Sequence, residues 1–366
     1  MLVPSLGKIL AAAPYHYGAA TYGSLYLPEI GGAILGALVA ARLQRRAGSP
    51  AVLRSGLIVN GFAMALLVLA SLTQGRLAYA AILTETLGLG LGFGLTLATL
   101  NPYAALLFPR TPATAITALN ALIGAATALA PLALHACAAR GYWGSLPLVL
   151  LTGFALLLFV APPPHRAGAD ERVHRGMLPY ALAVLLYAIA EGSFSSWAQV
   201  YVGRARHGDV FAATLALSAF WAGMTIARLL LGFAPERGGA QRVLFGLSAL
   251  GIGASFAALA LMSGADARVA GYAVAGAACS IFYPYVMAFG LRAWPRQSVA
   301  LAGLLVAALM IGEGIGSLAP GGLQSVITLP RLYLLLALLA LPLGYFAWTL
   351  PRRADAGAAA TGTLLS

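Results

Sequence analysis

The sequence predicts an all-α integral membrane protein that crosses the bilayer many times. Of its 366 residues, 61% are hydrophobic and only 9% are charged, whereas a soluble domain carries about 25% charged residues. Apolar runs of about 18 or more residues recur along the chain, and a run of that length is typical of a transmembrane helix. A repeat in the loop sequences also predicts a bundle of two pseudo-symmetric six-helix halves.

Eleven segments are apolar and long enough to cross a hydrocarbon core about 30 Å thick. They are residues 22–43, 52–72, 78–100, 113–137, 144–162, 178–202, 210–233, 242–262, 269–290, 298–320 and 331–350. The least apolar gap contains three prolines and several charged residues, which is typical of a linker. We therefore expect an N-terminal half bundle at 1–162, a cytoplasmic linker at 163–177, a C-terminal half bundle at 178–350 and a cytoplasmic tail at 351–366.

Residues 1–21 form a poor span because Pro4, Lys8, Pro14 and His16 interrupt them. We expect the first helix of the N-terminal half to be missing or truncated, because the chain starts downstream of its true start. The alternative is a genuine eleven-span protein.

The basic residues are distributed unequally between the two sides of the predicted bundle. Fifteen of the 22 lie in alternate gaps and in the C-terminal tail. The positive-inside rule places these gaps and the C-terminus in the cytoplasm. The net charge of +12 is thus spread over short loops between apolar runs, which argues against nucleic-acid binding. We expect a multi-pass protein of the bacterial inner (plasma) membrane.

Two loops carry the internal repeat. Residues 41–48 follow the first span, and residues 232–239 follow the seventh. The second copy holds Gly232, Glu236, Arg237 and Gly239, with Arg228 one turn earlier. Here the chain resembles the major facilitator superfamily, whose Gly-x-x-x-Asp/Glu-Arg-x-Gly loop helps to latch the cytoplasmic side. The first copy departs from that pattern, because Ala41 replaces the glycine and Arg45 replaces the acid.

Other stretches are similar to the fucose–proton symporter-like branch of that superfamily. They are Gly88 to Gly94 followed by Asn101-Pro102, Leu119-Asn120 with Gly124 and Pro131, Glu191 followed by Trp197 and Tyr201, Tyr283-Pro284, and Gly312 with Gly316 and Pro320. The resemblance implies a major facilitator-type bundle and a secondary transporter that works by alternating access. It does not fix a substrate.

Four glutamates lie inside apolar runs, at Glu29, Glu85, Glu191 and Glu313, in a chain with ten acidic residues. A carboxylate at membrane depth costs about 2.5–3.5 kcal/mol on insertion scales. We expect these groups to be paired, protonated or exposed to a wet cavity. Because burial disfavours the charged form of a carboxyl group, each is a candidate for proton coupling.

Glu191 is the leading candidate because it lies within a polar stripe. Tyr187, Glu191, Ser195 and Gln199 lie at successive spacings of four on one face of the helix. Such a stripe faces other helices or a cavity. An interhelical hydrogen-bond clamp is the alternative. Further candidates for contact with a solute are Trp197, Asn120 and Tyr283.

Glu313, between Gly312 and Gly316, is a candidate for either coupling or close helix packing. Glu29 and Glu85 lie nearer the outer ends of their spans, so for them we expect a role at an outside vestibule or gate, or in packing.

We expect a transporter for a small polar solute, a sugar or sugar-like compound, coupled to protons. The alternatives are a proton-driven exporter of cationic or amphipathic compounds, and a non-transporting scaffold or inactive remnant. No hydrolase arrangement and no metal-ligand spacing is found, so we expect no enzyme activity, cofactor or metal. The expected partners are a small-molecule substrate, protons and the lipid bilayer, and the expected state is a monomer.

Overall fold

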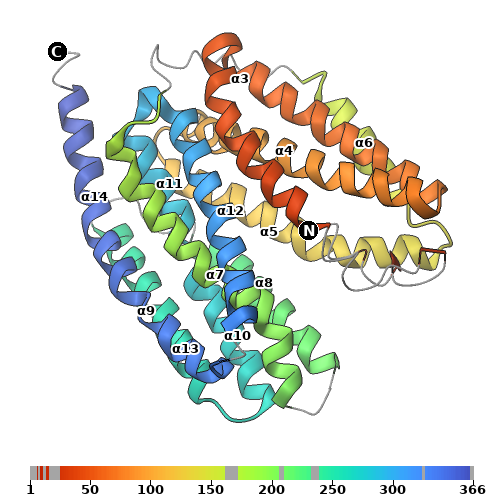
Figure 1. Cartoon of the computed structure of the whole chain (residues 1–366). Coiled ribbons are helices and arrows are strands. Elements are labelled where there is room, and N and C mark those ends of the chain that lie inside the picture. The colour runs from red at the N-terminus through yellow and green to blue at the C-terminus, as the bar shows by residue number, and fades with distance from the viewer. Residues whose placement is uncertain are drawn as a thin grey trace. The chain divides into compact units, whose positions relative to one another are not determined.

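The computed structural model describes residues 6, 9, 10, 14, 15, 25–160, 172–205, 210–231, 239–323 and 326–362. This part of the chain is helical between short turns and contains no strand. The α-helices, labelled as in Figure 1, are α3 (Tyr26–Leu72), α4 (Gly75–Leu107), α5 (Pro112–Ala139), α6 (Ser145–Leu157), α7 (Leu178–Ala205), α8 (Val210–Leu231), α9 (Ala240–Leu261), α10 (Ala265–Cys279), α11 (Phe282–Ala293), α12 (Ser298–Leu323), α13 (Leu329–Ala337) and α14 (Ala340–Gly362). Single 3₁₀ turns precede α7 (Arg175–Met177) and α12 (Pro295–Gln297).

The helices have the composition of a bundle that faces lipid. Seven helical segments in the described part of the chain are long and apolar enough to cross a membrane, and three shorter apolar helices accompany them. Large apolar side chains lie on the outside, with Leu72 68% and Leu341 72% exposed, whereas Glu85 and Asn101 are fully buried. Polar groups inside and apolar groups outside are the reverse of a soluble protein. The chain is a multi-pass integral membrane protein.

Each of the eleven predicted segments falls on helix, although several boundaries differ. The first two are two helical stretches that share the label α3 and meet at a kink, where Gly48 adopts a positive φ of 80° just before Pro50. The fifth is shorter than predicted, because α6 ends at Leu157. Two segments are interrupted, and in each case a proline follows the interruption: Pro284 after the end of α10, and Pro342 after the end of α13. Proline lacks an N–H, so it leaves a carbonyl four residues earlier without its helical partner. The number of membrane crossings stays a prediction.

The chain forms two compact units that are discontinuous in sequence. Unit 1 comprises residues 1–102, 126–173 and 296–307, and unit 2 comprises residues 103–125, 174–295 and 308–366. The predicted half bundles at 1–162 and 178–350 stay a prediction.

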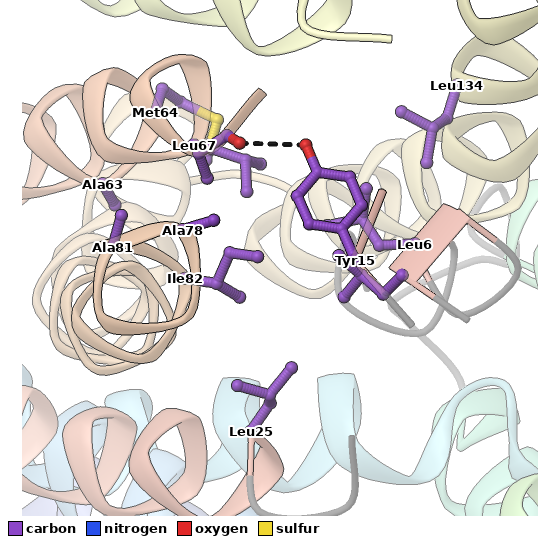
Figure 2. Packing of buried hydrophobic residues seen from close by; sticks show 12 residues of the cluster. Leu6, Tyr15, Leu25, Ala63, Met64, Leu67, Ala78, Ala81, Ile82 and Leu134 are labelled. Carbon is purple, nitrogen blue, oxygen red and sulfur yellow. Dashed lines mark hydrogen bonds between the residues drawn. The ribbon is translucent and has the colours of Figure 1, made fainter. Parts of the chain in front are cut away.

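The apolar core of unit 1 brings the N-terminal residues onto α3 and α4. Leu6, Leu10 and Leu25 are fully buried together with Met64 of α3 and Ile82 of α4. Figure 2 shows Tyr15 reaching into this cluster, where its hydroxyl donates a 2.9 Å hydrogen bond to the Ala70 carbonyl. Leu6, Leu10 and Tyr15 therefore pack as part of the core of unit 1.

Glycines set the closest helix approaches in both units. In unit 1, a Cβ on Gly90 of α4 would collide with the backbone carbonyl of Glu29 in α3. In unit 2, a Cβ on Gly276 of α10 would collide with the carbonyl of Phe220 in α8, and a Cβ on Gly316 of α12 with the carbonyl of Ile189 in α7. Small residues let helix backbones touch, which is how helices associate in lipid.

Candidate functional site

The junction between α10 and α11 in unit 2 is a break in a long apolar helix. Ser280 and Ile281 separate the two helices, and Pro284 lies in the first turn of α11. Because Pro284 has no N–H, the carbonyl of Ser280 loses its helical hydrogen bond, and the last carbonyls of α10 are also without helical partners. The break therefore places bare carbonyl oxygens in a buried environment.

Side chains from three other helices bind these carbonyls. The bonds run from Ser248 Oγ of α9 to the Ala278 carbonyl at 2.5 Å, from the Tyr187 hydroxyl of α7 to the Cys279 carbonyl at 3.0 Å, and from Arg228 Nε of α8 to the Ser280 carbonyl at 2.8 Å. A buried carbonyl without a partner costs about 1–3 kcal/mol. Three consecutive carbonyls are thus stabilised by α9, α7 and α8, and these contacts hold the break in place.

We expect Ser248→Ala to destabilise unit 2, because it removes the hydroxyl that donates to the buried Ala278 carbonyl. The cost should be about 1–3 kcal/mol, measured as a lower midpoint of thermal unfolding in detergent. Thr349→Val is the matched control, since the Thr349 hydroxyl binds only the carbonyl of Tyr345 in its own helix and is exposed. Equal midpoints for the two variants would contradict this account of the break.

Glu191 lies beside the capped break. Its side chain is 5% exposed. Its carboxyl group lies near the Tyr187 hydroxyl and interacts electrostatically with the Arg228 guanidinium. Among the described residues, no direct ion pair joins Glu191 to Arg228. The structure thus places a buried acid and a buried base near each other without direct contact.

Arg228 is held by two carbonyls. Besides the bond to Ser280, its Nη1 donates to the Asn120 carbonyl of α5 at 3.3 Å. The Asn120 side chain donates from Nδ2 to the Ile116 carbonyl in its own helix, at 2.8 Å. The side chain of Arg228 is 6% exposed, so a permanent positive charge is fixed inside unit 2.

Tyr283 of α11 joins the same cluster. It interacts electrostatically with Glu191, Arg228 and Glu313. Its hydroxyl is buried and has no hydrogen-bond partner in the described part of the chain. The structure therefore places four predicted residues of α5, α7 and α11 near Arg228. They are Asn120, Tyr187, Glu191 and Tyr283. Glu313 of α12 is in electrostatic range of Tyr283.

Trp197 and its neighbours on α7 bind α12 instead. The Trp197 Nε1 donates to the Ser317 carbonyl at 3.0 Å, and Ser196 and Ser317 hydroxyls lie 2.7 Å apart. Ser195 bonds weakly, at 3.4 Å, to the Gly192 carbonyl of its own helix. The side chain of Gln199 lies outside the described residues. Trp197 and Ser196 therefore stabilise the contact with α12, whereas Ser195 of the predicted stripe bonds within α7.

Glu85 and Glu29 form a separate pair in unit 1. Glu85 is fully buried, and neither of its carboxyl oxygens has a hydrogen-bond partner within the described residues. Glu29 is half-buried in the first turn of α3 and interacts electrostatically with Glu85. The other predicted latch residues cannot be placed alongside Arg228, because Gly232, Glu236 and Arg237 lie outside the described residues. Gly239 precedes α9 with a φ of 81°.

Sequence reasoning missed Ser248, Ser280 and Thr225. The hydroxyls of Ser280 and Thr225 are buried without a partner in the described part of the chain. Pro284 was a usable signal for Ser280, because the carbonyl four residues before a proline is always freed. Nothing in the sequence signals Ser248, which lies 30 residues from its partner.

Comparison with known proteins identifies the fold of this chain. No family model matches the chain, and no curated protein sequence matches it. Among solved structures, the Escherichia coli fucose:proton symporter FucP matches with a TM-score of 0.76 at 17% identity, over 95% of this chain and 95% of that one. The proton:xylose symporter XylE matches at 0.72 and 14%, over 95% and 90%. The human organic anion transporter MFSD10 matches at 0.74 and 13%, over 94% and 88%. The predicted resemblance is confirmed at the level of the fold, which is that of the major facilitator superfamily.

Proposed function

We propose that this protein is a secondary active transporter that moves a small polar, sugar-like solute together with a proton by alternating access. The observation that carries the proposal is the buried cluster around Arg228. An intramembrane acid and base are costly and are found where solutes or protons pass. The fold supports it further, because two of the similar structures are sugar–proton symporters by description.

Within the proposal, Glu191 carries the proton. It is a buried acid, 5% exposed, near the buried guanidinium of Arg228, and an acid inside the membrane is a candidate for carrying a proton. Tyr283, Tyr187 and Glu313 are the residues that we propose contact the solute. Two six-helix halves, at 1–162 and 178–350, and a cytoplasmic C-terminus remain part of the proposal.

Arg228 counts against the export of cationic compounds. That alternative depends on intramembrane acids without a nearby base. Arg228 lies in electrostatic range of Glu191 and Tyr283 and cannot lose its charge, so a cation would meet a fixed positive charge.

The test is uptake into proteoliposomes with an alkaline interior. We expect at least one sugar-like solute, neutral or acidic, to accumulate, and a protonophore to abolish its accumulation. Exchange of organic cations for protons, with no uptake of sugar-like solutes, would support the export alternative instead. Absence of any flux would favour a scaffold or an inactive remnant.

A further inference from the structure

We infer that the transported solute is a hydroxylated monocarboxylate, such as a sugar acid, with Arg228 binding its carboxylate while Glu191 carries the co-transported proton. This inference rests on the proposed function and names the substrate class of the same site. It depends on three observations: the open donors of Arg228, the charge balance of the cluster, and the hydroxyls without partners.

Arg228 presents donors that the protein does not use. A guanidinium has five N–H groups, and the described bonds occupy one on Nε and one on Nη1. No bond from Nη2 is found in the described part of the chain. Because the two carbonyl contacts fix the plane of the guanidinium, its remaining edge is preorganised, and a carboxylate is the group that pairs with such an edge in two parallel hydrogen bonds.

The charges of the cluster favour binding of an anion when Glu191 carries a proton. With Glu191 ionised, its charge offsets that of Arg228. With Glu191 protonated, the buried guanidinium has no compensating charge in contact, and a buried unpaired charge is costly. The other titratable groups facing Glu191 or Tyr283 are Tyr187, Cys279 and Glu313. A monoanion that enters with the proton restores neutrality, so each of the two ligands favours binding of the other.

The buried hydroxyls without a hydrogen-bond partner favour a ligand that carries several hydroxyl groups. Those of Tyr283, Ser280 and Thr225 are buried without protein partners in the described residues. Ser280 lies in the break, and Arg228 donates to its carbonyl. A Cβ on Gly124 of α5 would lie 3.0 Å from Thr225 Oγ1 and 3.7 Å from Arg228 Nη1, so glycine lets α5 approach both side chains closely. Buried polar groups are normally satisfied, and a polyhydroxy acid would satisfy these.

The experiment compares matched solutes in proteoliposomes that contain the full-length chain. Uptake of labelled glucuronate and gluconate is compared with uptake of glucose, in vesicles whose interior is either more alkaline or more acidic than the medium. The membrane potential is clamped by potassium and valinomycin. We expect saturable uptake of one or both acids, driven by an alkaline interior and insensitive to potential, because one proton and one monoanion carry no net charge.

Arg228→Gln should raise the KM for the acid about a hundredfold, since it removes a charged hydrogen-bond partner. Arg242→Gln is the matched control in the same unit, because Arg242 is half-exposed and pairs with Asp355 at the surface; its KM should match the wild type. Folding of each variant is checked by gel filtration in detergent.

The wild-type protein alone decides the question if Arg228→Gln does not fold. Uptake of glucose without inhibition by either acid would overturn the inference and leave the proposed function standing. Absence of uptake of all three compounds and of other sugar-like solutes would overturn both. Potential-driven uptake of an acid would contradict the one-to-one pairing with a proton and overturn the assignment of Glu191.

Discussion

Glu191→Gln is expected to abolish accumulation of solute against its gradient while the protein still folds and exchanges solute. The amide has the size of the carboxyl group, so unit 2 keeps its packing. The amide cannot bind and release a proton, so the pH gradient no longer drives transport. For one proton per solute, each pH unit drives about tenfold accumulation, equivalent to 1.36 kcal/mol; in the variant the accumulation ratio should be about one.

The measurement combines two assays on the same vesicles. Uptake with an alkaline interior reports coupling, and exchange of labelled for unlabelled solute without a gradient reports binding and movement. Asp355→Asn is the control, because Asp355 is an exposed acid of the same unit. Full pH-driven accumulation by Glu191→Gln would rule out this residue as the coupling group. If only Glu313→Gln lost accumulation, the proton would be assigned to α12 instead.

Gly316→Ala is expected to have a large effect on stability for the addition of a single methyl group. The new Cβ would collide with the Ile189 carbonyl and lie 2.9 Å from the Ser193 nitrogen of α7. Both are backbone atoms, which cannot rotate away, so the helices must separate. Overpacking of this kind costs about 1–3 kcal/mol, and separation would also stretch the 3.2 Å hydrogen bond from Ser193 Oγ to the Gly316 carbonyl.

Gly314→Ala is the matched control, two residues away on the same helix. Nothing lies within 4 Å of a Cβ at Gly314, and alanine favours helix by about 1 kcal/mol over glycine. Thermal unfolding in detergent should therefore show a lower midpoint for Gly316→Ala and an unchanged or higher one for Gly314→Ala. The opposite order would show that α7 and α12 do not touch along this face.

Composition and hydrophobic periodicity were sufficient to predict the helical segments, because a bilayer requires long apolar helices whatever their partners. The breaks were less predictable. Pro284 and Pro342 each signal a lost hydrogen bond. However, α10 and α11 belong to one continuous apolar run, so hydropathy alone does not separate the two helices.

The site could be predicted only in part. Glu191 and Tyr187 were found because a helix places them on one face, four residues apart. Arg228 was assigned to a loop motif by its neighbours in sequence, although its side chain binds a carbonyl 52 residues away in α10–α11 and another 108 residues away in α5. Such pairings depend on how the helices pack, and a single sequence does not contain that information.

The contact between α7 and α12 also constrains how the protein is made. Ser193 meets its partner Gly316 across 123 residues of chain. At a synthesis rate of about 5–20 residues per second, α7 waits roughly 6–25 s before α12 is complete. During that interval Glu191 and the hydroxyls beside it lie in a helix whose final neighbours do not yet exist. The nascent protein must therefore keep this polar face away from lipid, so the order of helix insertion matters to its assembly as much as the final packing does.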